Sequence, residues 1–231
     1  MDIILQGIKE GTALIFSGDS EIYQIVGLSL YVSTIAVLIS ACLGIPAGVL
    51  LGTHSFPGKG LIVRVIYTFM SLPPVIAGLV VFLILMRRGP LGMFQLNYTP
   101  MAMIIAQVCL VTPIIIGLTY NIVKEKAPTV NRLALTLGAG RFRRISLLMV
   151  EMRVGITTAV VSGFGRAISE VGAVMIVGGN IKGHTRVMTT YIAELKGMGN
   201  YERAIAIGII LLFLSFVVNA VLYSFQERES K

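Results

Sequence analysis

Acidic residues are missing from almost half of this chain, because no Asp or Glu occurs between Glu21 and Glu125. Tryptophan is absent altogether, and only 13% of the 231 residues are charged. Soluble globular domains carry about 25% charged residues. With 55% of the residues hydrophobic, the composition excludes an ordinary soluble domain. It predicts an all-α, polytopic membrane helical bundle that forms one domain.

Cysteine and histidine are almost as scarce. Cys42 and Cys109 both fall in apolar segments, where free thiols behave as small hydrophobic side chains, so a disulfide framework is not expected. His54 and His184 lie far apart in the sequence, which leaves no metal-ligand spacing. We therefore predict no metal site.

The residue patterns of enzymes are also missing. Neither an HExxH pair nor a Gly-x-Ser-x-Gly motif occurs, so we predict no catalytic residue. Residues 52–60 read GTHSFPGKG, but the spacing before Gly58 and Lys59 is wrong for a phosphate-binding loop. If the protein transports actively, its ATPase must be another chain.

Five segments are long and apolar enough to span a bilayer, which takes roughly 20 residues. The second segment contains Pro73-Pro74, the third contains Pro113, and the fourth contains four ionisable residues. The five predicted spans are residues 23–51, 61–86, 101–123, 149–177 and 204–225.

The net charge is +8, and no aromatic-rich basic motif indicates a nucleic-acid partner. The distribution of Lys and Arg among the loops instead orients the spans. The more basic side of the membrane would carry Lys59, Arg64, Lys124, Lys126, Arg132, Arg141, Arg143, Arg144, Arg153, Arg228 and Lys231. The other side has Lys9, Arg87, Arg88, Lys182, Arg186, Lys196 and Arg203. The bias predicts a multi-pass protein of the cell (inner) membrane with its N-terminus outside and its C-terminus in the cytoplasm.

Residues 1–18 do not form a cleavable signal peptide, because they lack a basic start and their apolar run is interrupted. Ile4, Leu5, Ile8 and Ile15 could line one face of a helix that lies on the outer membrane surface. A frayed terminus is the alternative.

Two features inside the spans are polar or interrupted. Pro73-Pro74 removes backbone hydrogen bonds that lipid cannot replace, so it is either a kink or a break beside a pathway. Arg166 and Glu170 are four residues apart and share a helix face. Because an unpaired charge in the bilayer costs roughly 3 kcal/mol, we expect an ion pair. With Ser169, this pair either lines or gates a polar path, or fixes helix packing.

A basic stretch, residues 131–144, stands between two spans. Its segment Leu137-Gly138-Ala139, together with Ala134, resembles the cytoplasmic loop motif of permease subunits of binding-protein-dependent ABC importers. Arg132 and Leu133 depart from the Glu-Ala that opens the family motif, and Val150-Glu151 replaces its later Leu-Pro.

Three further blocks resemble the molybdate, sulfate and tungstate permeases within that family, and the chain is most similar to the tungstate branch. The blocks are residues 72–78 (LPPVIAG), 163–173 (GFGRAISEVGA) and 180–186 (NIKGHTR). Their order and spacing match the family across nearly the whole chain.

The resemblance implies a type I importer-like transmembrane domain over residues 1–231. It also implies a homodimer, two copies of a cytoplasmic ABC ATPase and an external substrate-binding protein. ATP and magnesium would be bound by the ATPase, with no cofactor on this chain. Within a coupling loop at residues 124–147, a short helix near 134–140 would enter a cleft of the ATPase. The residues expected to couple to the ATPase are Ala134, Thr136, Leu137, Gly138, Ala139, Gly140 and Arg141.

The cargo expected from the resemblance is an oxyanion, tungstate first, which alternating access would carry into the cytoplasm. A molybdate or sulfate importer is the alternative. A stand-alone channel or secondary carrier is a different class. A carrier should show paired broken helices, and Pro73-Pro74 has no evident counterpart in the second half of the sequence.

Overall fold

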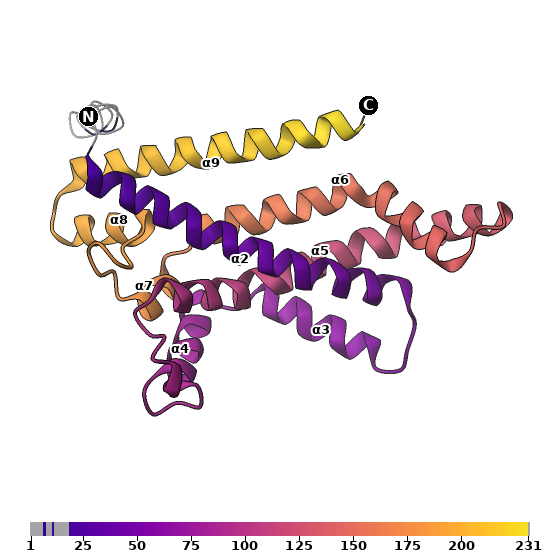
Figure 1. The fold of residues 1–231 in the computed structure, drawn as a ribbon, viewed down its shortest axis with the longest axis horizontal. Coiled ribbons are helices and arrows are strands. Elements are labelled where there is room, and N and C mark those ends of the chain that lie inside the picture. The colour runs from indigo at the N-terminus through magenta and orange to yellow at the C-terminus, as the bar shows by residue number, and fades with distance from the viewer. Residues whose placement is uncertain (1–6, 8–10, 12–18, 231) are drawn as a thin grey trace.

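Every element of the structure is helical in the residues that it describes, which are Gly7, Gly11 and residues 19–230 (Figure 1). The predicted surface segment at residues 1–18 lies outside this range except for two glycines and stays a prediction. The structure is a computed structural model of the full chain. The elements are α2 (Ser20–Thr53), α3 (Lys59–Met70), α4 (Pro74–Leu85), η1 (Gly92–Phe94), α5 (Pro100–Thr136), α6 (Arg141–Ile168), α7 (Gly172–Gly178), α8 (Met188–Gly197) and α9 (Tyr201–Ser230).

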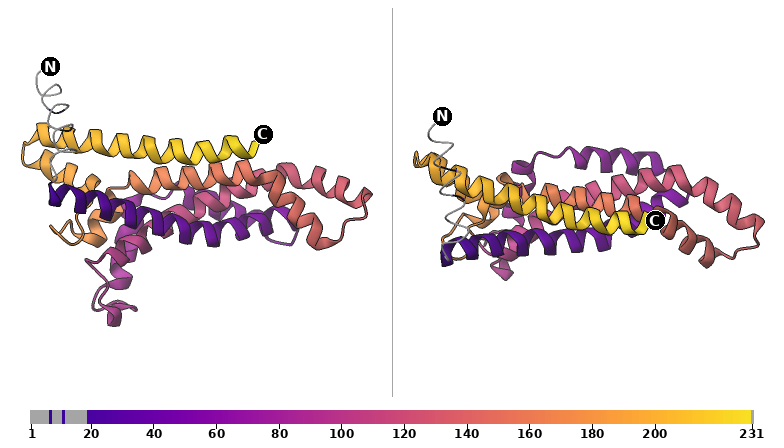
Figure 2. Two further views of the ribbon diagram at one scale, coloured as in Figure 1. Left: turned by 45° about the horizontal axis from the view of Figure 1, so that its top comes forward. Right: turned by 90° about the horizontal axis from the view of Figure 1, so that it is seen from above.

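The long helices run side by side along the length of the molecule, as all three ribbon views show (Figures 1 and 2). Four helices of the described chain are long and apolar enough to cross a membrane, and α3 with α4 adds a fifth span if that bent pair is counted as one. The all-α bundle with about five spans is therefore confirmed.

Helix starts follow from local sequence. The Asp19 side chain accepts a hydrogen bond from the Glu21 backbone N–H at 2.9 Å and so caps α2. Thr99 caps α5 in the same way through the N–H of Ala102, and Pro100 supplies the first helical residue.

Close contact between α2 and α5 is made possible by a stripe of glycines. A Cβ atom at Gly44 would lie 2.9 Å from a methyl of Ile115, and one at Gly48 would lie 2.6 Å from Thr119 Cβ. A Cβ at Gly52 would overlap Val123. Small residues let membrane helices approach closely enough for extensive van der Waals contact. This contact drives helix association in lipid, where the hydrophobic effect does not.

The second predicted span is broken at Pro73-Pro74. Helices α3 and α4 meet at 100°, and α4 leaves the long axis of the bundle (Figure 1). Pro74 begins α4, where its missing N–H has no partner to lose. Gly78 of α4 packs directly on α7, since a Cβ there would lie 2.6 Å from Ala173 Cα. The helix is therefore interrupted at this point, and a position of Pro73-Pro74 beside a pathway stays a prediction.

The fourth predicted span, residues 149–177, is wrong in both boundaries. Helix α6 begins at Arg141 and ends at Ile168, and α7 is a separate helix. The apolar sequence continues across residues 169–178, so hydropathy alone conceals the break. The second half of the chain thus contains a helix break that the sequence did not reveal.

Replacing Gly48 by valine should lower the stability of the fold, because its side chain has no room against Thr119. Overpacking of this kind costs about 1–3 kcal/mol. Thermal unfolding in detergent measures the effect, and Gly27→Val is the matched control because a Cβ at Gly27 meets open space. Equal melting temperatures for the two variants would contradict the close α2–α5 contact.

Candidate functional site

The turn between α5 and α6, residues 137–140, projects beyond the rest of the bundle (Figure 1). Gly138 has φ +69°, the left-handed conformation that only glycine adopts readily. Its N–H donates to Leu135 O at 3.0 Å, and the N–H of Ala139 donates to Ala134 O at 2.8 Å. These two bonds form a Schellman motif, which satisfies the last carbonyls of α5.

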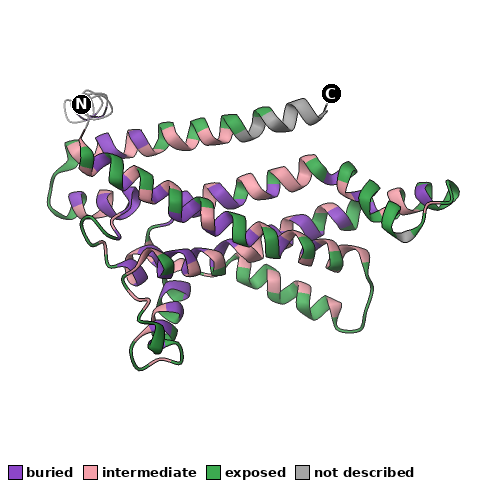
Figure 3. Ribbon diagram, viewed as in Figure 1, coloured by how far each residue is buried: buried purple, intermediate pink, exposed green. Residues whose placement is uncertain are grey.

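The surface around this turn is apolar and open to solvent. Leu137 is 81% exposed and Phe142 is 92% exposed, while Leu133 and Leu135 are more than half exposed. Figure 3 shows the colour of exposed residues on both helices of the hairpin near its tip. Large apolar side chains exposed on a projecting tip indicate a site of contact with another protein or with the membrane.

The structure brings the seven predicted coupling residues together at this hairpin, but not as a separate short helix. Residues 134–136 are the last turn of α5, and Arg141 begins α6. Ala134 is buried, whereas Thr136 is exposed and its hydroxyl donates to Leu133 O at 2.7 Å within the last turn of α5. The role in coupling remains a prediction.

Sequence reasoning missed Leu133, Leu135 and Phe142 as the main exposed surface of the hairpin. Apolar residues are usually buried, so their type gave no indication of exposure. The one available signal was their position within the basic stretch, residues 131–144, which contains two glycines.

At the opposite end of α6 the predicted ion pair is present. Arg166 Nη1 lies 2.7 Å from Glu170 Oε2, and the Glu170 side chain is only 3% exposed. The other carboxylate oxygen accepts the N–H of Ala173 at 3.0 Å, at the start of α7. The backbone carbonyl of Glu170 accepts the Thr189 hydroxyl at 2.8 Å. Glu170 therefore ties α6, α7 and α8 together.

Neighbouring polar side chains form hydrogen bonds with backbone groups at the end of α6 and the start of α8. The amide of Gln107 on α5 donates to Ala167 O at 3.1 Å, and the Ser29 hydroxyl on α2 accepts the N–H of Met188 at 2.9 Å. A residual cavity of about 10 Å³ lies among Ser33, Gln107 and Thr189. Ser169 is exposed and donates to Gly165 O at 2.8 Å, so it does not contact the pair through its hydroxyl.

The two helix breaks lie next to each other. A Cβ at Gly172 would sit 3.0 Å from a methyl of Val75, directly after Pro73-Pro74. The structure thus gathers Pro73, Pro74, Arg166 and Glu170 near one level of the bundle, although they come from distant parts of the sequence. Whether these residues gate a pathway is not tested by this arrangement.

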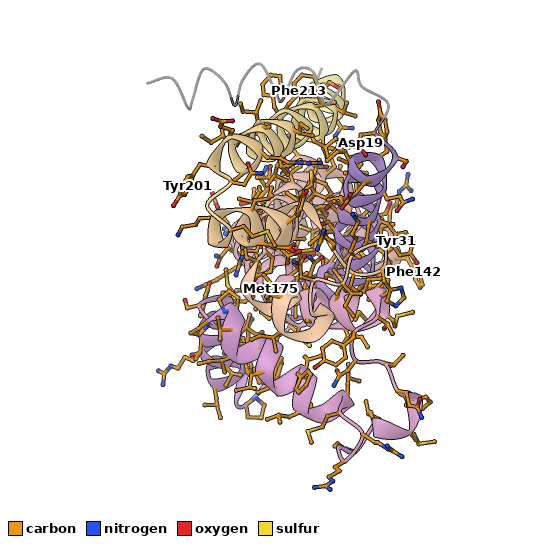
Figure 4. The ribbon with its side chains drawn as sticks, turned by 90° about the vertical axis from the view of Figure 1, so that its left-hand side faces the viewer. Asp19, Tyr31, Phe142, Met175, Tyr201 and Phe213 are labelled. Atoms are coloured by element: carbon orange, nitrogen blue, oxygen red, sulfur yellow. The ribbon has the colours of Figure 1, made fainter. Side chains whose placement is uncertain are left out.

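A second charged network stands at the end where α7 and α8 lie, the end that faces the viewer in Figure 4. Arg186 bridges Glu21 at 3.3 Å and Glu194 at 2.9 Å, and its guanidinium stacks on Tyr191 at 4.9 Å. Asn180 also donates to Glu194. The sequence did not predict this network, because its members are far apart along the chain.

In the described part of the chain, no group of three His, Cys, Asp or Glu side chains could hold a metal ion.

Comparison with known proteins decides the family. Residues 44–231 match the model of the binding-protein-dependent transport system inner membrane component. The chain belongs to this family. It is therefore an integral membrane subunit of an ABC transporter rather than an enzyme, and it works with a separate ATPase and a binding protein.

Individual relatives of the permease agree with this assignment. It is 51% identical to the tungstate uptake system permease protein TupB of Peptoclostridium acidaminophilum, over 99% of this chain and all of that protein. It is 44% identical to a probable anion ABC transporter permease protein of Haloferax volcanii, over 89% and 90% of the two chains. It is 30% identical to the molybdenum transport system permease protein ModB of Escherichia coli, over 85% and 91%.

Glu170→Gln should destabilise the permease, because it leaves Arg166 without its counter-charge at the α6–α7 break. Hydrogen bonds to charged groups contribute about 1.5–3 kcal/mol. Glu151→Gln is the matched control, since Glu151 forms an exposed ion pair with Lys126 at 3.0 Å. Thermal unfolding of the purified proteins should show the larger loss for Glu170→Gln, and equal losses would argue against its central place.

Proposed function

We propose that this permease is the transmembrane subunit of a tungstate importer. The observation that carries the proposal is the 51% identity to a tungstate uptake permease over essentially the full length of both chains. The molybdenum permease is a more distant relative at 30% identity, so molybdate is the second candidate. Sulfate is the third, since the sulfate permeases also belong among the relatives.

The importer would work as a homodimer. In the described part of α3 no residue is buried, and much of α4 is open as well, which leaves a large apolar face for lipid or a second copy. A two-fold dimer would use the same face on both subunits. The exposed large apolar side chains of these helices are Leu61, Ile62, Val65, Tyr67, Phe69, Val75, Ile76, Leu79, Val80, Leu83 and Ile84.

The α5–α6 turn would lie in the cytoplasm, with the N-terminus outside and the C-terminus inside. Two features support this orientation. The basic residues Arg132, Arg143 and Arg144 cluster near the turn, and positive charge marks the cytoplasmic side of membrane proteins. Helix α9 also starts at the end where α2 starts and runs towards the turn end (Figure 1).

The apolar tip of the turn would contact the ATPase, which binds ATP and magnesium. Because α5 and α6 are continuous helices that run from the turn into the bundle, a displacement of the tip moves their membrane parts as well. The ion pair Lys126–Glu151 and the buried side chains Leu148 and Met152 hold the two helices together. Closure of the ATPase would thus reach the transmembrane core mechanically.

The pathway would open and close by alternating access at the interface of the two copies. Pro73, Pro74, Arg166, Ser169 and Glu170 mark the breaks around which α4 and α7 could move as a unit, because these helices pack on each other. No Asp or Glu occurs in α3 or α4, which suits a dianionic cargo. High affinity would reside in the external binding protein.

Uptake of labelled oxyanion into vesicles tests the proposal. With the ATPase and the binding protein present, tungstate should enter in an ATP-dependent manner, and excess sulfate should not compete with it. An ATPase variant that cannot hydrolyse ATP is the control. Faster uptake of molybdate or sulfate than of tungstate would overturn the assignment of the cargo, and uptake without ATP would overturn the importer mechanism.

A further inference from the structure

A groove of about 460 Å³ opens between the C-terminal end of α2, the end of α5 and the start of α6. This volume is in the range of small-molecule pockets, about 300–1,000 Å³. The groove lies at the base of the hairpin that carries the α5–α6 turn. Its lining residues include Ile45, Pro46, Val49, Leu50, Leu148 and Met149.

The groove is amphipathic along its length. Helix α2 runs towards the turn. Among the groove residues of α2, Ile45 is therefore farthest from the turn, and Thr53 lies about 12 Å nearer to it, at 1.5 Å per residue. The walls far from the turn, which we call the deep walls, are apolar. The polar lining residues Thr53, His54, Asn131 and Arg144 all lie at the end of the groove nearest the turn.

At the end of the groove nearest the turn, the cation Arg144 has no side-chain partner among the residues that the structure describes. Its Nε atom is buried and has no hydrogen-bond acceptor, and no salt bridge joins Arg144 to a described carboxylate. None of the described residues that line the groove is Asp or Glu. A buried guanidinium nitrogen without an acceptor is costly, so the site favours an anionic ligand.

We infer that an anionic phospholipid of the cytoplasmic leaflet occupies this groove, with one acyl chain against the deep walls and its phosphate at Arg144. The polarity of the groove changes along its length in the same way as that of a phospholipid, since the apolar part faces the bilayer interior and the cation faces the head-group level. Basic pockets between membrane helices at the cytoplasmic side bind such head groups. A second copy or the ATPase would instead have to offer an acidic group beside a narrow apolar segment.

The lipid would brace the hairpin. Val49, Leu148 and Met149 belong both to the groove and to the cluster in which α5 packs on α6. An acyl chain there would fill space beside this cluster and stiffen the base of the α5–α6 hairpin. The inference concerns lipid binding and does not rest on the identity of the cargo.

Native mass spectrometry of the purified full-length permease with its ATPase subunits tests the site, using phosphatidylglycerol and phosphatidylcholine as probes. The wild type should retain phosphatidylglycerol preferentially. Arg144→Gln should weaken this binding about fivefold, the effect of one basic residue at a membrane surface. Arg144→Lys should restore part of it. Arg153→Gln is the control, because Arg153 is an exposed residue of the same helix that does not line the groove.

Two further variants separate the occupants. Leu50→Trp keeps Arg144 but fills the groove, since Leu50 lines it, and should also reduce phosphatidylglycerol retention. A photoreactive residue in place of Met149 should cross-link to lipid. Cross-links to the ATPase or to a second permease, or equal lipid retention by the wild type, Arg144→Gln and Leu50→Trp, would overturn the inference.

Discussion

The bilayer offers no water to a broken helix, so each interruption must be satisfied by the protein itself. Glu170 meets this requirement at the α6–α7 break. One carboxylate oxygen neutralises Arg166, the other caps α7 through Ala173, and the backbone carbonyl accepts Thr189. Because α4 packs on α7, the second break at Pro73-Pro74 lies beside the break that Glu170 satisfies.

The bundle on the other side of these breaks is built for stiffness. Gly44, Gly48 and Gly52 bring α2 into direct contact with α5, and α5 continues without a break to the turn. The short helices α4 and α7 differ from this part, because each begins at one of the two breaks. Under the proposed function, the long helices would transmit motion from the ATPase, and α4 and α7 would move as the pathway opens.

The sequence was sufficient for features that depend on local pattern. Apolar runs predicted about five spans, and the spacing of four predicted the Arg166–Glu170 pair. It was insufficient where tertiary contact decides. The break after Ile168 is hidden in an apolar run, and the exposure of Phe142 depends on how far the hairpin projects. The bridge from Arg186 to Glu21 joins residues 165 positions apart.

The central claim is that the apolar tip of the α5–α6 turn is the contact with the ATPase, and the affinity of that subunit for a Phe142→Ala permease tests it most directly. Phe142 is 92% exposed, so its removal leaves the fold intact. Loss of an aromatic anchor weakens binding about tenfold or more. Phe216→Ala is the control, since Phe216 is 71% exposed on α9, away from the turn. The account predicts weaker binding for Phe142→Ala alone, and unchanged affinity would contradict it.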